Sequence, residues 1–160
     1  MPDITHVVTI QASPERVYSA VTTAEGIRNW WTHQVHLDSR IGGTGEFRFN
    51  QGRTVTQVRV DEAEPPVRVR WTTVFSNAPA GWSGSTIAFD LRREDGATVL
   101  SFTHRGFREA DERFFRVSAG WAYYLTCLQR YLEKGYGALH GDIDLARLIA
   151  RKDGALKSTY

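Results

Sequence analysis

Residues 110–134, ADERFFRVSAGWAYYLTCLQRYLEK, decide the fold, because they form a long amphipathic helix pattern at the end of a strand-rich sequence. Large apolar residues recur there at steps of 3, 4, 4, 3 and 4, the spacing of one helix face: Phe114, Val117, Trp121, Leu125, Leu128 and Leu132. Such a helix spans about 37 Å. The pattern therefore predicts a helix that lies across a whole sheet.

Strand patterns fill most of the chain before this helix. They cover residues 4–11, 46–50, 54–60, 87–91 and 99–105. The clearest alternation is at residues 67–75, where we expect every second side chain to face inward: Val67, Val69, Trp71, Thr73 and Phe75. The acidic residues after position 60 read as a solvated turn that ends at a proline pair.

Two short helices are predicted after the first strand. Ser13 and Pro14 form a helix start, and Thr23 can cap a second helix that contains Trp30 and Trp31. Adjacent helical residues point about 100° apart, so we expect one of these tryptophans to be buried and the other to lie near a cavity mouth; the alternative is a purely structural role for both.

The predicted order is strand, two short helices, six antiparallel strands and a long helix, which is a single α+β domain. We assign residues 1–136 to this domain and residues 137–160 to a C-terminal extension. Leu145, Leu148 and Ile149 have helical spacing, so a short extra helix is expected in the extension.

Composition narrows the class of protein. The 160 residues are 41% hydrophobic and 24% charged, with a net charge of +2 and scattered basic residues, so a nucleic-acid partner is not expected. The single cysteine, Cys127, cannot form an internal disulfide and suits a reducing compartment. No signal peptide and no membrane-length apolar stretch is evident, so we expect a cytoplasmic protein without a membrane span.

Three segments, in order, resemble one superfamily. Residues 12–18 (ASPERVY) with 26–31 (GIRNWW), residues 103–107 (THRGF), and Gly120-Trp121 with the following leucines are similar to the START-like (SRPBCC) helix-grip proteins. Together they point to the branch named after the heat-shock ATPase activator homologues. The resemblance covers about residues 4–136.

This resemblance implies a helix-grip fold of the START and birch-pollen-allergen type, in which a curved antiparallel sheet grips the C-terminal helix around a cavity. Members hold lipids, sterols, polyketides or plant hormones, and some catalyse cyclisation or dehydration. We therefore expect binding of a small hydrophobic molecule by a monomer or homodimer. The alternatives are a protein-interaction module of the chaperone ATPase co-regulator type and a polyketide cyclase/dehydratase-like enzyme.

Aromatic side chains and one histidine are the expected cavity lining. His104 shares a strand face with the apolar Phe102, so its imidazole should point inward. It could be satisfied by its neighbours, contact a ligand, or act as a general base. The full predicted ligand-binding set is Trp30, Trp31, Phe49, Trp71, Thr73, Phe75, Phe89, Phe102, His104, Trp121, Tyr124, Leu125 and Leu128.

Other motifs do not support catalysis. His33, His36 and Asp38 are possible metal ligands, but no further histidine or cysteine lies near them. The segment at 81–84 fails the G-x-S-x-G pattern because Ser85 stands where glycine is required. No pair of carboxylates forms an acid/base couple, so we assign no catalytic residue, metal or cofactor.

Overall fold

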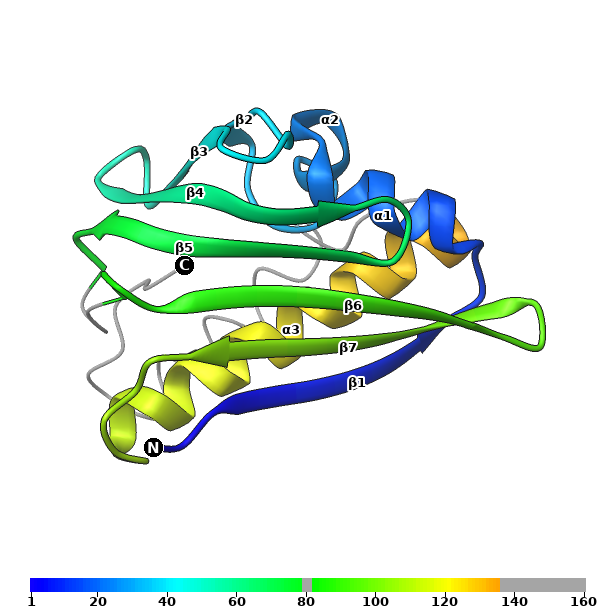
Figure 1. Ribbon diagram of the computed structural model, residues 1–160. Coiled ribbons are helices and arrows are strands. Elements are labelled where there is room, and N and C mark those ends of the chain that lie inside the picture. Colours follow the sequence, from blue (N-terminus) through cyan, green and yellow to red (C-terminus); the bar gives the residue numbers. More distant parts are fainter. Residues whose placement is uncertain (79–81, 136–160) are drawn as a thin grey trace.

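The computed structural model describes residues 1–78 and 82–135 (Figure 1). Within these residues the elements are β1 (Ile4–Ile10), α1 (Pro14–Thr22), α2 (Ala24–Ile27), β2 (Gln34–Leu37), β3 (Thr44–Phe49), β4 (Thr54–Glu64), β5 (Arg68–Ser76), β6 (Thr86–Glu94), β7 (Ala97–Arg105) and α3 (Glu112–Lys134). This confirms the predicted α+β order and locates β2, which no clear pattern in the sequence indicated. The short helix expected near Leu145 lies outside the described residues.

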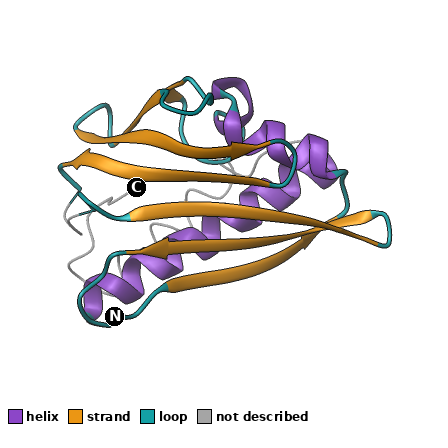
Figure 2. Cartoon of the chain, in the orientation of Figure 1, coloured by secondary structure: helices purple, strands orange, loops and turns teal. Residues whose placement is uncertain are grey.

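The strands form one antiparallel sheet in the order β1-β7-β6-β5-β4-β3-β2. The first strand thus pairs with the last, with Val8 opposite Leu100. Helix α3 crosses one face of the sheet obliquely, and α1 and α2 lie at one end of it (Figures 1 and 2). The opposite face carries no described helix. This is the helix-grip arrangement that the resemblance implied.

Local capping signals set the helix ends. The Ser13 hydroxyl accepts from the backbone N–H of Arg16 at 3.3 Å, and Pro14 stands in the first turn of α1. Asp111 caps α3 by accepting from the N–H of Phe114 at 3.0 Å. The helix ends at Gly135, whose φ of +83° is the left-handed conformation that glycine adopts without strain. Because Asp111 is the cap, α3 begins at Glu112, two residues later than predicted.

Two β-bulges bend the sheet between β4 and β5. At the first, Gln57 pairs with Phe75 and Val58 with Thr73, so Val74 is an extra residue on β5. At the second, Asp61 is an extra residue on β4. Bulges increase local twist and bend the strand that carries them, so they contribute to the curvature of the sheet.

The first bulge overturns part of the predicted inward face of β5. Val69, Trp71 and Thr73 are buried, but Phe75 is 46% exposed. The extra residue shifts the alternation, so that Phe75 pairs with the outward-facing Gln57. Val67 precedes β5 and is 52% exposed. Both predictions were wrong: strict alternation assumes a strand without a bulge at Val74, and it also assumes that the strand already includes residue 67.

The acidic residues after Val60 also differ from prediction. Asp61 and Glu62 lie on β4 instead of a solvated turn, and they pair with Arg68 and Arg70 of β5. Hydrogen bonds from these two arginines, chiefly that from Arg68, hold the pKa of Glu62 below its ordinary value. The uncovered sheet face is therefore lined with ion pairs at this point.

Candidate functional site

The inner sheet face and α3 enclose a continuous cluster of aromatic rings. Neighbouring ring centroids are between 4.4 Å, for Phe102 and Trp121, and 6.4 Å, for Trp30 and Phe89. These spacings are typical of tilted and edge-to-face aromatic pairs. The aromatic cluster, as we call it below, comprises Trp30, Trp31, Phe47, Phe49, Trp71, Trp82, Phe89, Phe102, His104 and Trp121.

The expectation that only one of the two adjacent tryptophans is buried was wrong. Trp30 is 0% and Trp31 1% exposed, and their rings stack at 5.8 Å. Helix α2 ends at Ile27, so both residues lie in the turn that follows and the helical angle does not separate them. The Trp30 indole donates to the carbonyl of Ala20 at 2.9 Å, and Trp31 packs on Trp121 at 5.0 Å. Both therefore anchor the short helices to the core.

His104 is fully buried on β7, with Trp82 and Phe107 packed edge-on against its ring at 4.8 Å each. Burial lowers its pKa from 6.5 to about 3, because no counter-charge compensates the lost hydration of the imidazolium. The ring is therefore neutral at physiological pH.

Hydrogen bonds engage both nitrogens of His104. The Trp121 indole donates to Nδ1 at 3.1 Å, and Nε2 lies 2.8 Å from the Ser85 hydroxyl. An indole N–H can only donate, so Nδ1 must accept and the single proton of the neutral ring is on Nε2. Nε2 then donates to Ser85, whereas a general base would have to accept there. This geometry favours a structural link between β7 and α3 over a catalytic role.

Two other buried tryptophans have unused polar atoms. The indole N–H groups of Trp31 and Trp71 have no hydrogen-bond acceptor among the described residues. Both side chains are at most 1% exposed, and both rings contact Phe47. Most buried donors in folded proteins are paired, so two unpaired donors in one aromatic cluster require a physical explanation.

Thr73 is buried on the inner face of β5, and the other predicted ligand-binding residues outside the aromatic cluster fall into two groups. Tyr124, Leu125 and Leu128 are buried along the C-terminal half of α3 and belong to the same hydrophobic core. Burial raises the pKa of Tyr124. Phe75 lies on the outer face of the sheet and cannot line a space between the sheet and α3.

Sequence reasoning missed three residues of this region. Trp82 lies in the segment that fails the G-x-S-x-G pattern, but its ring packs on Trp121 at 6.0 Å. Ser85 was considered only as a failed motif position, yet its hydroxyl contacts His104. Phe47 is absent from the predicted ligand-binding set, yet its ring contacts both Trp31 and Trp71. Alternation on 46–50 could have indicated Phe47, whereas no local pattern indicates the other two.

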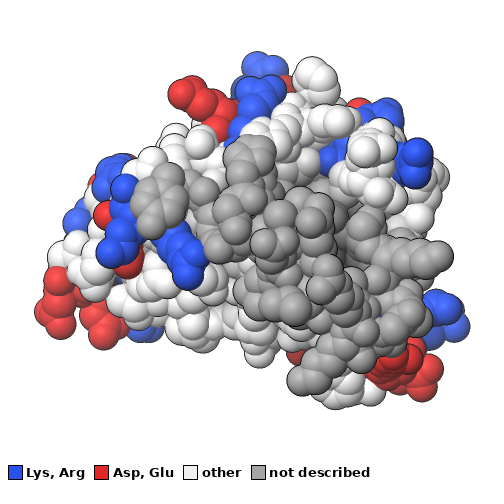
Figure 3. Space-filling model, turned by 180° about the vertical axis from the view of Figure 1, so that it is seen from behind, with Lys and Arg blue, Asp and Glu red and all other residues white. Residues whose placement is uncertain are grey.

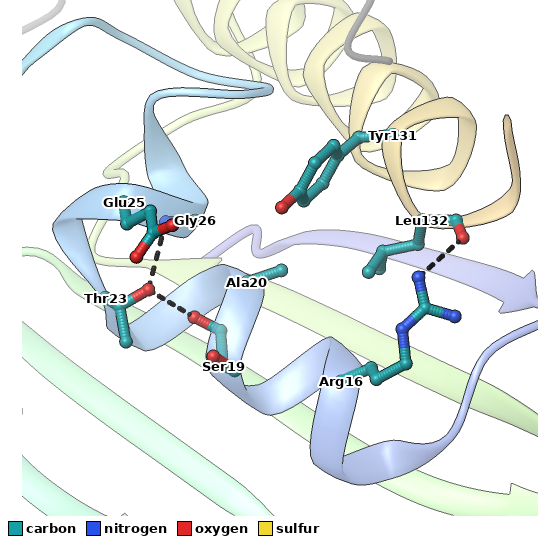
Figure 4. A pocket seen from close by; sticks show the side chains of 8 residues that line it. All are labelled: Arg16, Ser19, Ala20, Thr23, Glu25, Gly26, Tyr131 and Leu132. Atoms are coloured by element: carbon teal, nitrogen blue, oxygen red, sulfur yellow. Dashed lines mark hydrogen bonds between the residues drawn. The ribbon is translucent and has the colours of Figure 1, made fainter. Parts of the chain in front are cut away.

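Surface pockets lie outside the aromatic cluster. One, of about 230 Å³, lies between α1, α2 and the end of α3 (Figure 4). There Arg16 donates to the carbonyl of Leu132 at 3.0 Å, and the Thr23 hydroxyl caps α2 by accepting from Gly26 at 3.0 Å. Tyr131 points across the pocket toward the short helices. These polar groups mainly hold helix ends in place.

Two further pockets open elsewhere on the surface. A pocket of about 400 Å³ lies at the start of α3, with Phe107, Arg108 and Arg113 in its lining. Another, of about 280 Å³, lies on the outer sheet face beside Val74, with His36 and other residues of β2 to β4. The predicted cavity between the sheet and α3 is not among these pockets and stays a prediction.

The charged side chains visible in Figure 3 do not gather into one patch of a single sign. On the face turned away in Figure 1, acidic and basic side chains lie in several separate groups (Figure 3). Of the possible metal ligands His33, His36 and Asp38, to which no metal was assigned, Asp38 pairs with Arg40 at 2.9 Å. Across residues 1–78 and 82–135, no group of three or more His, Cys, Asp or Glu side chains could hold a metal ion. Nor is any helix in these ranges long and apolar enough to cross a membrane.

Comparisons with solved structures agree with this architecture. The chain is 34% identical to the Aha1 dimer from Colwellia psychrerythraea, with a TM-score of 0.76, covering 86% of this chain and 100% of that one. A protein from Staphylococcus saprophyticus matches at 21% identity and a TM-score of 0.72, covering 85% and 95% of the two chains. An HSP90 activator from Plasmodium falciparum matches at 17% identity and a TM-score of 0.64, covering 84% and 96%.

The last two likenesses show the fold alone, because their sequence identities are low. Among curated proteins, none matches the chain in sequence. Residues 11–133 match the family described as Activator of Hsp90 ATPase homolog 1-like protein, which spans both short helices, the strands from β2 to β7 and nearly all of α3. The chain therefore belongs to this family of Activator of Hsp90 ATPase homolog 1-like proteins.

Proposed function

We propose that this domain binds a small, largely apolar ligand between the sheet and α3. The observation that carries the proposal is the pair of buried indole N–H groups, Trp31 and Trp71, that have no acceptor among the described residues. Leaving a buried donor unpaired costs about 1–3 kcal/mol. A ligand that accepts from these donors would recover that cost in the bound state.

The surroundings of the two donors suit such a ligand. Aromatic walls with a few polar groups are the usual lining of small-molecule sites. Phe47 touches both Trp31 and Trp71, and Trp121 adds a further wall from α3. The same rings also pack on one another, so ligand binding requires some of these side chains to move apart.

A ligand screen tests the proposal. Thermal shift and native mass spectrometry against lipids, phenolics and polyketide-like aromatics should identify a stabilising ligand. In a two-dimensional ¹⁵N–¹H spectrum, that ligand should shift the indole signals of Trp31 or Trp71. A Trp71→Phe variant should weaken binding, because it removes one donor and little apolar surface.

The matched control is Val74→Ser, which lies on the outer sheet face and is 50% exposed in the native protein. It should leave ligand binding unchanged. If Val74→Ser abolishes binding while Trp71→Phe does not, the ligand binds the outer face and the proposal is wrong. The proposal also fails if no compound shifts any indole signal.

A second candidate function is self-association and binding of a partner protein. Val74 and Phe75 project from the uncovered sheet face because of the bulge, and Val74 lines a surface pocket with Glu46, which pairs with Arg48. The Colwellia relative, described as an Aha1 dimer, supports a homodimer, and the family description supports a chaperone ATPase as partner. The apolar pair is the specific observation that favours this candidate.

Light scattering after size exclusion tests self-association, and an ATPase assay with an Hsp90 tests partner binding. A dimer that dissociates in Phe75→Ser would support the outer face as the interface. If the protein is a monomer and leaves the ATPase rate unchanged, this candidate is wrong.

We do not propose cyclase or dehydratase chemistry, because both nitrogens of His104 are engaged in hydrogen bonds and the ring offers no free base.

A further inference from the structure

A directed chain of hydrogen bonds crosses the core beside the aromatic cluster. Trp121 donates to Nδ1 of His104, and Nε2 of His104 in turn donates to Ser85 at 2.8 Å. The Ser85 hydroxyl donates to the hydroxyl of Thr73 at 3.3 Å. Because the indole can only donate, every step runs in the same direction, from α3 toward β5.

Thr73 is the last member of this chain, and its own O–H is a donor. The side chain is 1% exposed, and no described residue accepts from it. Thr73 lies two residues after Trp71 on the same inward face of β5, about 7 Å further along the strand. The indole of Trp71 is also a donor without an acceptor among the described residues. This part of the core therefore has two hydrogen-bond donors on the same face of one strand.

The core also lacks charge. The buried polar side chains of the described residues are threonines, Ser85 and His104, and none is a lysine, arginine, aspartate or glutamate. His104 supplies no positive charge either, because burial keeps it neutral. An ionised ligand would lose its hydration without gaining a counter-ion, which is strongly unfavourable.

We propose that the ligand of this domain is uncharged and presents an acceptor oxygen, as a ketone, quinone, lactone or ester does, to the indole N–H of Trp71 and the hydroxyl of Thr73. This inference rests on the proposed function, since it assigns the chemistry of the same ligand. It excludes carboxylates, such as free fatty acids. It also disfavours ligands whose polar groups only donate.

Three probes of one shape test the inference: 2-acetylnaphthalene, 2-isopropenylnaphthalene and 2-naphthoate. The first two differ only in a carbonyl oxygen replaced by a methylene group, and the third carries a negative charge. One hydrogen bond changes an equilibrium by roughly twofold to tenfold. We expect the ketone to bind about fivefold more tightly than the alkene, and the naphthoate to bind at least about tenfold more weakly than the ketone.

The five tryptophan indole signals report where each probe binds. The ketone should move the Trp71 signal toward that of a hydrogen-bonded N–H, and the alkene should cause only ring-current shifts. Thr73→Val should reduce the ketone-to-alkene affinity ratio by about twofold or more. The matched control is Thr98→Val on β7, whose buried hydroxyl donates to the carbonyl of Ala12 at 2.7 Å, and this variant should keep the native ratio.

The possible outcomes separate this inference from the proposed function. If the alkene or the naphthoate binds as tightly as the ketone while indole signals still shift, the acceptor inference is overturned and ligand binding stands. An affinity ratio that is unchanged in Thr73→Val overturns the assignment to Thr73. If no probe shifts any indole signal while a compound of the broader screen does, the acceptor inference fails and ligand binding stands; if neither the probes nor the screen shift an indole signal, both fail.

Discussion

The buried His104 predicts a loss of stability in mild acid. Its pKa is about 3 in the folded protein because of burial, whereas the ordinary value is 6.5. Between these values the unfolded chain binds a proton that the folded chain does not bind, so stability falls as the pH decreases below about 6.5. Each unit of pKa difference corresponds to about 1.4 kcal/mol.

From pH 7 to pH 5 the expected loss is therefore about 2 kcal/mol, a large share of the roughly 5–15 kcal/mol that stabilises a domain. This window avoids most carboxylate titration. The pKa values of Glu46 and Glu62 lie below their ordinary 4.5, mainly because Arg48 donates a hydrogen bond to Glu46 and Arg68 donates one to Glu62. The stability that these pairs provide is therefore lost mainly below about pH 4.5.

Urea denaturation at pH 7, 6 and 5 measures this effect directly. His104→Gln is the comparison, because glutamine keeps an N–H donor for Ser85 but has no titrating group. This variant should be less stable at pH 7, yet its free energy of unfolding should be nearly constant between pH 7 and pH 5. Equal losses in the native protein and the variant would refute the reasoning.

Three further substitutions have defined expected outcomes. Trp121→Ala should lower the free energy of unfolding by about 3–5 kcal/mol and weaken ligand binding, because it opens a cavity among packed rings; a loss below about 1 kcal/mol would show that Trp121 is not a core anchor. Asp111→Ala should lower it by about 1 kcal/mol through loss of the α3 cap, whereas Glu109→Ala, which removes an exposed carboxylate two residues earlier, should change it little. Phe75→Ser should change it by less than about 0.5 kcal/mol, since the side chain is 46% exposed; a loss above about 2 kcal/mol would place Phe75 in the core.

Local signals in the sequence determined the order of the elements. The Ser13-Pro14 start, the cap at Thr23 and the stripe on residues 110–134 each act within a few residues, so a single sequence is enough to read them. The inward direction of Trp71 and His104 also followed from alternation on their strands. The family resemblance then joined these elements into the helix-grip fold.

Only the tertiary structure decided which residues meet. The bulge at Val74 depends on the pairing of β5 with β4, so no pattern within β5 could place Phe75 outside. The partners of His104 come from the segment before β6 and from α3, at sequence separations of 19 and 17. Its neutral state and tautomer follow from those long-range contacts and from burial. The sequence alone thus determined a sheet gripped by a helix. Tertiary packing determined which buried hydrogen-bond donors have no acceptor, because burial and hydrogen-bond partners depend on residues distant along the chain.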